Sequence, residues 1–202
     1  MRRFGALLAL LSLLWFSGCG KKESEQPPRK ESNLTLKKAV RPPAPTAHRF
    51  KIRDIDKRET ELEFTEERAL FHRIRQPLVM IVLFADWCPP CRGMLPYLSQ
   101  LQAANSEELF VIGVMVHSDL DDEAMRRFML RYDTNFFISR HPDNEALGKY
   151  LSKQYGLGEN YPLPLTLIYK NGKYLMHISG AAPYEILQNL VDQLKEKRSK
   201  KE

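Results

Sequence analysis

The feature that most constrains this chain is a pair of cysteines placed where a buried strand gives way to a helix. Leu78–Phe84 is an uninterrupted apolar run, which is typical of a strand covered on both faces. Cys88 and Cys91 follow it, and apolar residues then recur at helical intervals as far as Ala104. Cysteines one helical turn apart can reach the Cα separation of about 4.4–6.8 Å that a disulfide needs. The pattern therefore predicts a dithiol–disulfide centre.

The two cysteines are predicted to differ in role. Cys88 falls at the helix cap, where free backbone amides and the positive end of the helix favour a thiolate, so it is the predicted nucleophile. Cys91 is the predicted resolving thiol, which attacks the mixed disulfide and releases the product. Pro89 and Pro90 fit a first helical turn but have no N–H group, so only the Cys91 amide remains nearby to stabilise the thiolate. We therefore expect a reducing pair.

The N-terminus predicts export. Arg2 and Arg3 precede the apolar run Ala6–Phe16, which is short for a membrane-spanning helix and is typical of a secretory signal. The sequence Ser17-Gly18-Cys19 resembles the lipobox of bacterial lipoproteins, in which the cysteine is lipidated and becomes the mature N-terminus. We expect residues 1–18 to be a lipoprotein signal peptide and Cys19 to be the lipidation site.

The composition divides the rest of the chain into a tether, one domain and a tail. Residues 19–47 are rich in Lys, Glu and Pro and are predicted to form a flexible tether behind the lipidated cysteine. A chain of 202 residues with 43% hydrophobic residues has room for about one folded domain, predicted at 48–197, with a disordered tail at 198–202. The expected location is the cell envelope, with the domain lipid-anchored to a membrane and facing the periplasm or extracytoplasmic space.

Alternating strand and helix patterns from His48 onward predict an α/β domain with a partly parallel sheet. Strands are expected at 50–55, 61–64, 78–84, 109–116, 136–138, 165–169 and 174–179. Helices are expected at 66–73, 91–104, 119–132, 144–154 and 183–197. The pair Asn171-Gly172 between two of these strands predicts a tight hairpin.

A family resemblance rests on residues spread along this domain. They are Trp87-Cys88-Pro89-Pro90-Cys91, Pro96, Leu163-Pro164, Lys170-Asn171-Gly172 and Gly180. Together they resemble thioredoxin, and the long segment 117–161 resembles the TlpA/ResA-like branch of exported, membrane-anchored thiol-disulfide oxidoreductases. The resemblance implies an α/β thioredoxin fold with an N-terminal β extension and a central αβ insertion.

The resemblance also implies site residues and partners. Pro164 would be cis and face the cysteines, the backbone of Leu163 would hold an extended substrate, and Pro89, Pro90 and Pro96 would be supporting residues. Apart from the resemblance, we expect Trp87 to act both as a packing lid and as a substrate contact. The redox-active disulfide would need no cofactor. Expected partners are exported cysteine-containing proteins, among them apocytochrome c, and a membrane thiol reductant that supplies electrons. The chain departs from thioredoxin at Val82, where a buried acid is usual, which leaves Asp86 and Glu159 as candidate proton acceptors for Cys91.

Other readings of the cysteine pair remain open. A disulfide oxidase or isomerase would use the same residues. A copper metallochaperone without redox turnover would pair the thiolates with His117, Met115 or Met94, although these residues also suit a strand end and the core. No second cysteine pair completes a zinc site, so no metal is expected. The net charge of +6 forms no basic stripe interleaved with aromatic residues, which argues against nucleic-acid binding.

Overall fold

The computed structural model describes residues 46–199, with side chains as far as residue 195. Its strands are β1 (His48–Arg53), β2 (Glu59–Phe64), β3 (Ala69–Phe71), β4 (Leu78–Phe84), β5 (Leu109–Met115), β6 (Phe137–Ser139), β7 (Leu165–Lys170) and β8 (Lys173–Ser179). Its helices are α1 (Pro89–Ala104), α2 (Asp122–Arg131), α3 (Asn144–Gln154) and α4 (Tyr184–Ser199). The predicted signal peptide, Cys19, all but the last two residues of the predicted tether, and residues 200–202 lie outside the described residues.

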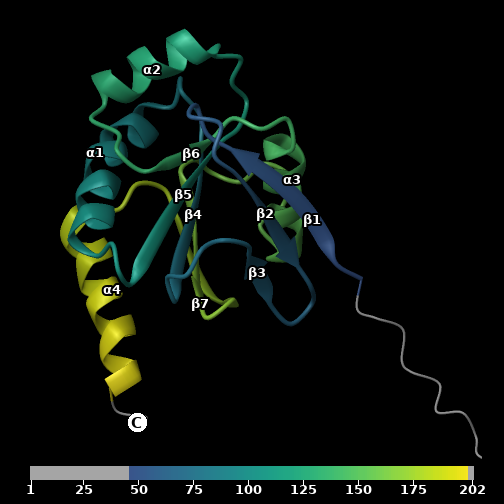
Figure 1. The fold of residues 1–202 in the computed structure, drawn as a ribbon, viewed down its shortest axis with the longest axis vertical. Coiled ribbons are helices and arrows are strands. Elements are labelled where there is room, and N and C mark those ends of the chain that lie inside the picture. Colours follow the sequence, from purple (N-terminus) through teal and green to yellow (C-terminus); the bar gives the residue numbers. More distant parts are fainter. Residues whose placement is uncertain (1–45, 200–202) are drawn as a thin grey trace, which may run out of the picture. The chain divides into compact units, whose positions relative to one another are not determined.

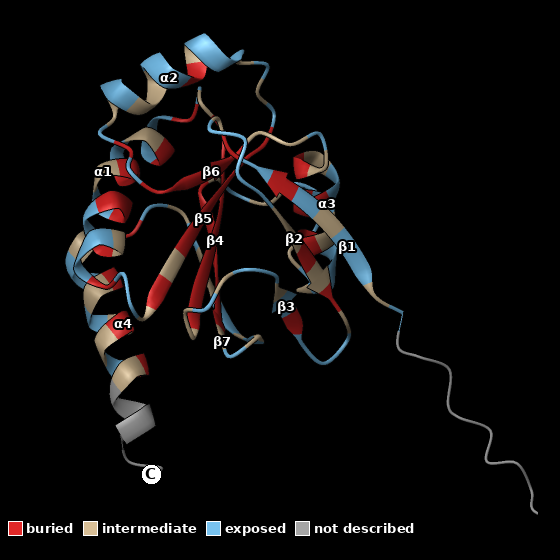
Figure 2. Ribbon diagram, viewed as in Figure 1, coloured by how far each residue is buried: buried red, intermediate tan, exposed pale blue. Residues whose placement is uncertain are grey.

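Strand β4 forms the centre of a five-stranded sheet with the order β6-β5-β4-β7-β8. It pairs in parallel with β5 and antiparallel with β7. Every residue of β4 is buried, because successive side chains point to opposite faces and both faces are covered. Met80, Val82 and Phe84 belong to one buried apolar cluster with residues of α1 and α4. Val79, Ile81 and Leu83 belong to a second cluster with residues of α3 and the N-terminal strands. Figure 2 shows β4 buried along its length (its place in the fold is labelled in Figure 1).

The predicted additions to the core are both present. Strands β1, β2 and β3 form a separate three-stranded antiparallel sheet ahead of β4, which is the expected N-terminal β extension. The segment between β5 and β7 adds α2, β6 and α3, which is the expected central insertion. Figure 1 shows α3 beside the N-terminal strands and α1 beside α4 on the other side of the large sheet. Helix α3 of the insertion and the N-terminal extension thus cover one face together, whereas α2 contributes Met125 to the cluster on the α1 and α4 side.

The predicted helix at 66–73 is wrong. This segment contains a bend and then β3, which pairs with β2 through Leu62 and Phe71. The amide of Ala69 donates to the carbonyl of Gly172 at 2.7 Å, and the Phe71 ring packs edge-on against Tyr169, with ring centroids 5.2 Å apart. Eight residues are too few for helical periodicity to be decisive, and these distant partners favour the extended form.

Other element boundaries differ by a few residues. Helix α2 begins at Asp122 rather than Asp119, because the Asp121 side chain caps it by accepting the Ala124 amide at 2.7 Å. Helix α4 continues through Ser199, two residues into the predicted tail. The β7–β8 hairpin is confirmed, with both Asn171 and Gly172 at positive φ. Within residues 46–199, no helix combines the length and apolar character needed to cross a bilayer.

Candidate functional site

The cysteine pair lies where β4 passes into α1. Cys88 is the N-cap residue, with an extended backbone conformation, and Pro89 and Pro90 occupy the first two helical positions. Prolines are well suited to these positions, since the amides that they lack would have no helical partner. The Cys91 amide points back to the Cys88 sulfur at 3.3 Å, so the one donor expected from the sequence is in place.

Cys88 and Cys91 are joined in a disulfide, and their Cα atoms are 5.3 Å apart. Both residues are buried, but only Cys88 lines a surface groove. A reacting molecule therefore reaches the Cys88 sulfur first. This difference in access matches the roles predicted for the two cysteines, with Cys88 as the attacking thiol and Cys91 behind it.

The groove has a volume of about 440 Å³ and is open to solvent. The residues that line it are Trp87, Cys88, Pro89, Pro90, His117, Glu159, Asn160, Tyr161 and Leu163. Trp87 is 59% exposed although it is a large apolar side chain, which is typical of a contact surface. Of the predicted substrate and support residues, all but Pro96 and Pro164 lie in this lining; Pro96 is inside α1.

The Leu163–Pro164 peptide bond is cis, as the resemblance implied. It brings the Leu163 carbonyl oxygen to 3.7 Å from the Cys88 sulfur. The Pro164 carbonyl accepts the Gly180 amide at 2.8 Å, which joins this loop to the end of β8. Residues 75 positions apart in the chain are therefore held side by side at the disulfide.

The groove contains three residues that sequence reasoning did not assign to it. Asn160 and Tyr161 come from the insertion, and His117 follows β5, where the sequence favoured an ordinary strand-end residue. Tyr161 is partly buried, and burial, followed by the nearby Glu145 carboxylate, raises the pKa of its hydroxyl. The only sequence signal for Tyr161 is its position just before the Pro162-Leu163-Pro164 segment.

The three positions considered for the proton acceptor of Cys91 lie in different environments. Val82 is buried in β4 on the α1 side of the sheet, so no carboxylate occupies that position. Glu159 is exposed in the groove lining, whereas Asp86 is partly buried and does not contribute to the lining. Glu159 therefore shares the groove with Cys88 and not with Cys91, which does not line it.

The residues considered as copper ligands have other partners. Met94 is buried in α1 and its sulfur accepts the Ala182 amide at 3.5 Å, and Met115 is in the core. The His117 ring pairs with Glu145, the two atoms Nδ1 and Oε2 being 3.1 Å apart. Across the described part of the chain, the set of three potential metal-ligating side chains within mutual reach is Glu61, Glu63 and His72, which includes neither cysteine.

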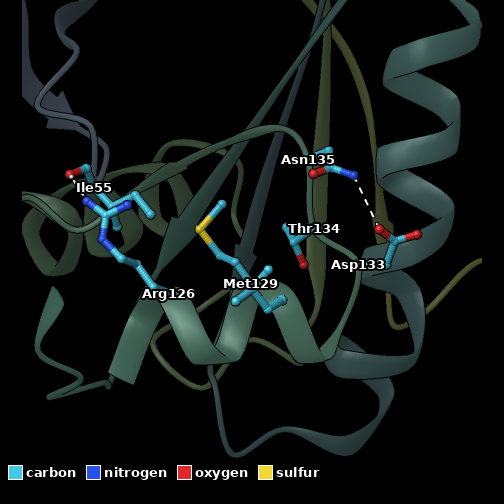
Figure 3. Close-up of a pocket in the computed structure, with 7 residues that line it drawn as sticks. Ile55, Arg126, Met129, Asp133, Thr134 and Asn135 are labelled. Carbon is cyan, nitrogen blue, oxygen red and sulfur yellow. Dashed lines mark hydrogen bonds between the residues drawn. The ribbon is translucent and has the colours of Figure 1, made fainter. Parts of the chain in front are cut away.

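A second depression, of about 300 Å³, lies between α2 and the β1–β2 connection (Figure 3). Arg126 points to the carbonyl of Ile55, and the Asn135 side-chain Nδ2 donates to the Asp133 carboxylate at 3.2 Å. Its lining contains no cysteine or histidine. We therefore assign the chemistry to the groove beside Cys88.

The sequence is similar to proteins named thiol-disulfide oxidoreductases. No family model matches the sequence. The chain is 26% identical over 149 residues to the thiol-disulfide oxidoreductase ResA of Bacillus thuringiensis subsp. konkukian, covering 73% of this chain and 76% of the relative. ResA of Bacillus anthracis is 25% identical over 149 residues, again covering 73% and 76%.

Solved structures agree with this at the level of the fold. A thioredoxin family thiol:disulfide interchange protein from Chlorobium tepidum gives a TM-score of 0.54 at 17% identity, covering 74% of this chain and 96% of that one. StoA from Bacillus subtilis gives a TM-score of 0.50 at 18% identity, covering 73% and 98%. The expected thioredoxin fold is thereby confirmed.

Proposed function

Since this chain is a thioredoxin-superfamily protein similar to ResA, and a thiol-disulfide oxidoreductase, we propose that it reduces disulfides of exported proteins at the membrane surface. The observation that carries the proposal is the position of the pair: Cys88 faces an open groove and Cys91 lies one turn behind it. The proposed substrates are exported proteins with oxidised cysteines, including apocytochrome c. The ResA relatives and the predicted export signal support this choice of substrate.

The proposed cycle moves two electrons. The Cys88 thiolate attacks one sulfur of the substrate disulfide, forming a mixed disulfide and releasing the other substrate sulfur as a thiolate. The Cys91 thiolate then attacks the Cys88 sulfur, forming the Cys88–Cys91 disulfide and releasing the second substrate thiolate, and both substrate thiolates take up protons. The substrate is reduced and the pair is oxidised. A membrane dithiol must return two electrons before the next turnover.

The reducing direction is supported by the two prolines. Stabilising the thiolate stabilises the reduced dithiol and raises its reduction potential. Fewer hydrogen-bond donors at the Cys88 sulfur therefore favour a stronger reductant. Pro89 and Pro90 contribute no N–H, and the Cys91 amide is the backbone donor to the Cys88 sulfur. An oxidase or isomerase would use the same residues but would require a higher potential.

The equilibrium potential of the pair tests this direction. We expect a value well below about −230 mV against glutathione and dithiothreitol buffers, and a value near −120 mV would overturn the reductase proposal. Pro89→His restores an N–H and adds a possible cation, so it is expected to raise the potential by at least ~30 mV. Pro183→His, at the start of α4, is the matched control. Stoichiometric Cu(I) binding without insulin reduction would instead favour a metallochaperone.

We also propose that a lipid at Cys19 tethers the domain, with residues 19–47 as the flexible segment. The motif Ser17-Gly18-Cys19 and the apolar run before it support this anchor. In a bacterial host fed radiolabelled palmitate, we expect the wild-type chain to take up label and Cys19→Ala to take up none. Cys88→Ala is the control and should remain labelled. Label on Cys19→Ala, or an unlabelled wild type, would contradict the anchor.

A further inference from the structure

The exposed indole of Trp87 is held at the groove by a hydrogen bond. Its Nε1–H donates to the His117 carbonyl at 3.0 Å, and both residues line the groove beside Cys88. Trp87 precedes the nucleophile directly in the chain, so the position of its ring affects what can approach the Cys88 sulfur. The hydrogen bond therefore makes the position of the indole depend on His117, which lies 30 residues away.

His117 is itself held by Glu145 of α3. The Glu145 carboxylate accepts the His117 backbone N–H through Oε1, and its Oε2 is 3.1 Å from Nδ1 of the ring. His117 has a φ of 54°, a left-handed conformation that non-glycine residues seldom adopt. A single carboxylate thus contacts both the backbone and the ring of His117, the residue in the left-handed conformation. This contact stabilises the turn that presents the His117 carbonyl to Trp87.

The start of helix α3 is attached to the sheet, which defines where the Glu145 side chain begins. The neighbouring Asn144 is 4% exposed and donates to the carbonyls of Met115 and Ser139, both at 2.8 Å. The Asn144 side-chain oxygen Oδ1 accepts the Ser139 hydroxyl at 2.6 Å. These bonds join the first turn of α3 to the ends of β5 and β6. The central insertion therefore holds the backbone of Glu145 near the active-site turn, with the carboxylate against His117.

The same helix supports a second side of the groove. Gly148 is three residues after Glu145, and residues at this spacing share a helix face. A Cβ at Gly148 would lie 2.7 Å from the Tyr161 hydroxyl oxygen and 3.3 Å from a methyl group of Val116. The absence of a side chain at Gly148 therefore lets the groove residue Tyr161 approach α3. Glu145 and Gly148 together make α3 the support for two aromatic groove residues.

We propose that Glu145, acting through His117, is a positioning residue that sets the place of Trp87 for peptide substrates. This inference rests on the proposed reductase function, because it concerns how a protein disulfide is presented to Cys88. A peptide must fit along the groove beside the indole, whereas a small disulfide needs only the Cys88 sulfur. Loss of the Glu145 contacts should therefore weaken peptide binding and leave the intrinsic reactivity of Cys88 unchanged.

The test uses the full chain with Trp15→Phe, which leaves Trp87 as the sole tryptophan. Glu145→Ala is compared with Glu123→Ala, which removes another first-turn glutamate, from α2. For a disulfide-containing peptide we expect Glu145→Ala to raise KM about 10-fold, with kcat within about twofold. Reduction of 2-hydroxyethyl disulfide should be unchanged, and Trp87 fluorescence anisotropy should fall. Glu145→Gln keeps an oxygen for the His117 amide, so it should restore part of the peptide affinity.

Three results would overturn the proposal. The first is a peptide KM for Glu145→Ala equal to that of Glu123→Ala. The second is an equal loss of activity toward the peptide and toward 2-hydroxyethyl disulfide. The third is a Trp87 anisotropy that Glu145→Ala leaves unchanged. Failure of the proposed function has a different signature, because the parent chain would then reduce neither substrate. The anisotropy comparison would still test the contact between Glu145, His117 and Trp87. Thermal unfolding of each variant identifies a loss of activity that comes from misfolding.

Discussion

Cys88→Ser is expected to lower the rate of disulfide reduction by at least ~10³-fold, since an alcohol is a far weaker nucleophile than a thiolate at neutral pH. Cys88 is the cysteine that lines the groove, so no other described thiol can replace it at the first step. The measurement is turnover with a peptide disulfide and a dithiol electron donor. Circular dichroism and thermal unfolding of the variant establish that the fold is retained.

Cys91→Ser is expected to fail at a different step. The variant keeps the Cys88 thiol and can attack a substrate, but it lacks the thiol that resolves the mixed disulfide. It should accumulate a covalent complex that non-reducing electrophoresis detects and that dithiothreitol separates by reducing the mixed disulfide. Cys88→Ser is its control and should form no such complex. A complex trapped by Cys88→Ser but not by Cys91→Ser would reverse the two assignments.

Gly172→Ala is expected to lower the free energy of unfolding by about 3 kcal/mol. Gly172 has a φ of 76°, and a Cβ there would lie 2.3 Å from the carbonyl oxygen of Ala69. That oxygen is backbone, so the clash can be relieved only by moving β3 away from the hairpin. The movement would strain the bond from the Ala69 amide to the Gly172 carbonyl. Urea denaturation of the oxidised protein measures the loss.

Gly158→Ala is the matched control for this prediction. Its φ of 77° is nearly the same, but nothing lies within 4 Å of a Cβ built there. Only the cost of the left-handed conformation remains, which is about 1 kcal/mol. The difference between the two variants therefore measures the close packing of the hairpin on the N-terminal extension. Equal losses would mean that this packing contributes nothing to stability.

Local sequence was sufficient where the pattern was long or chemically distinctive. The apolar run of β4, the cap and periodicity of α1 and the periodicity of α3 predicted those elements within two residues. Asn171-Gly172 specified its turn because both residues tolerate positive φ. The prediction of a helix at 66–73 failed because the pattern of the segment is short and its partners lie outside it, Leu62 in β2 and Gly172 in the β7–β8 turn.

The candidate site was predicted only in part. Cys88, Trp87 and the prolines are adjacent in the chain, so spacing alone brought them together. Leu163 was placed by family resemblance, and its position beside Cys88 comes from the antiparallel pairing of β4 with β7. His117, Tyr161 and Glu145 have no common sequence signature. They meet because β5 ends beside β4 and the insertion returns across that same edge of the sheet.

The sequence by itself determined the chemistry of this protein: a helix-capping cysteine, two prolines without amides and a second cysteine one turn later. Those properties are local, because spacing within one helical turn and the absence of an N–H do not depend on distant residues. The tertiary structure decided which cysteine is accessible, what surrounds it and how Trp87 is held. These properties depend on contacts between residues tens of positions apart, which exist only once the sheet has formed.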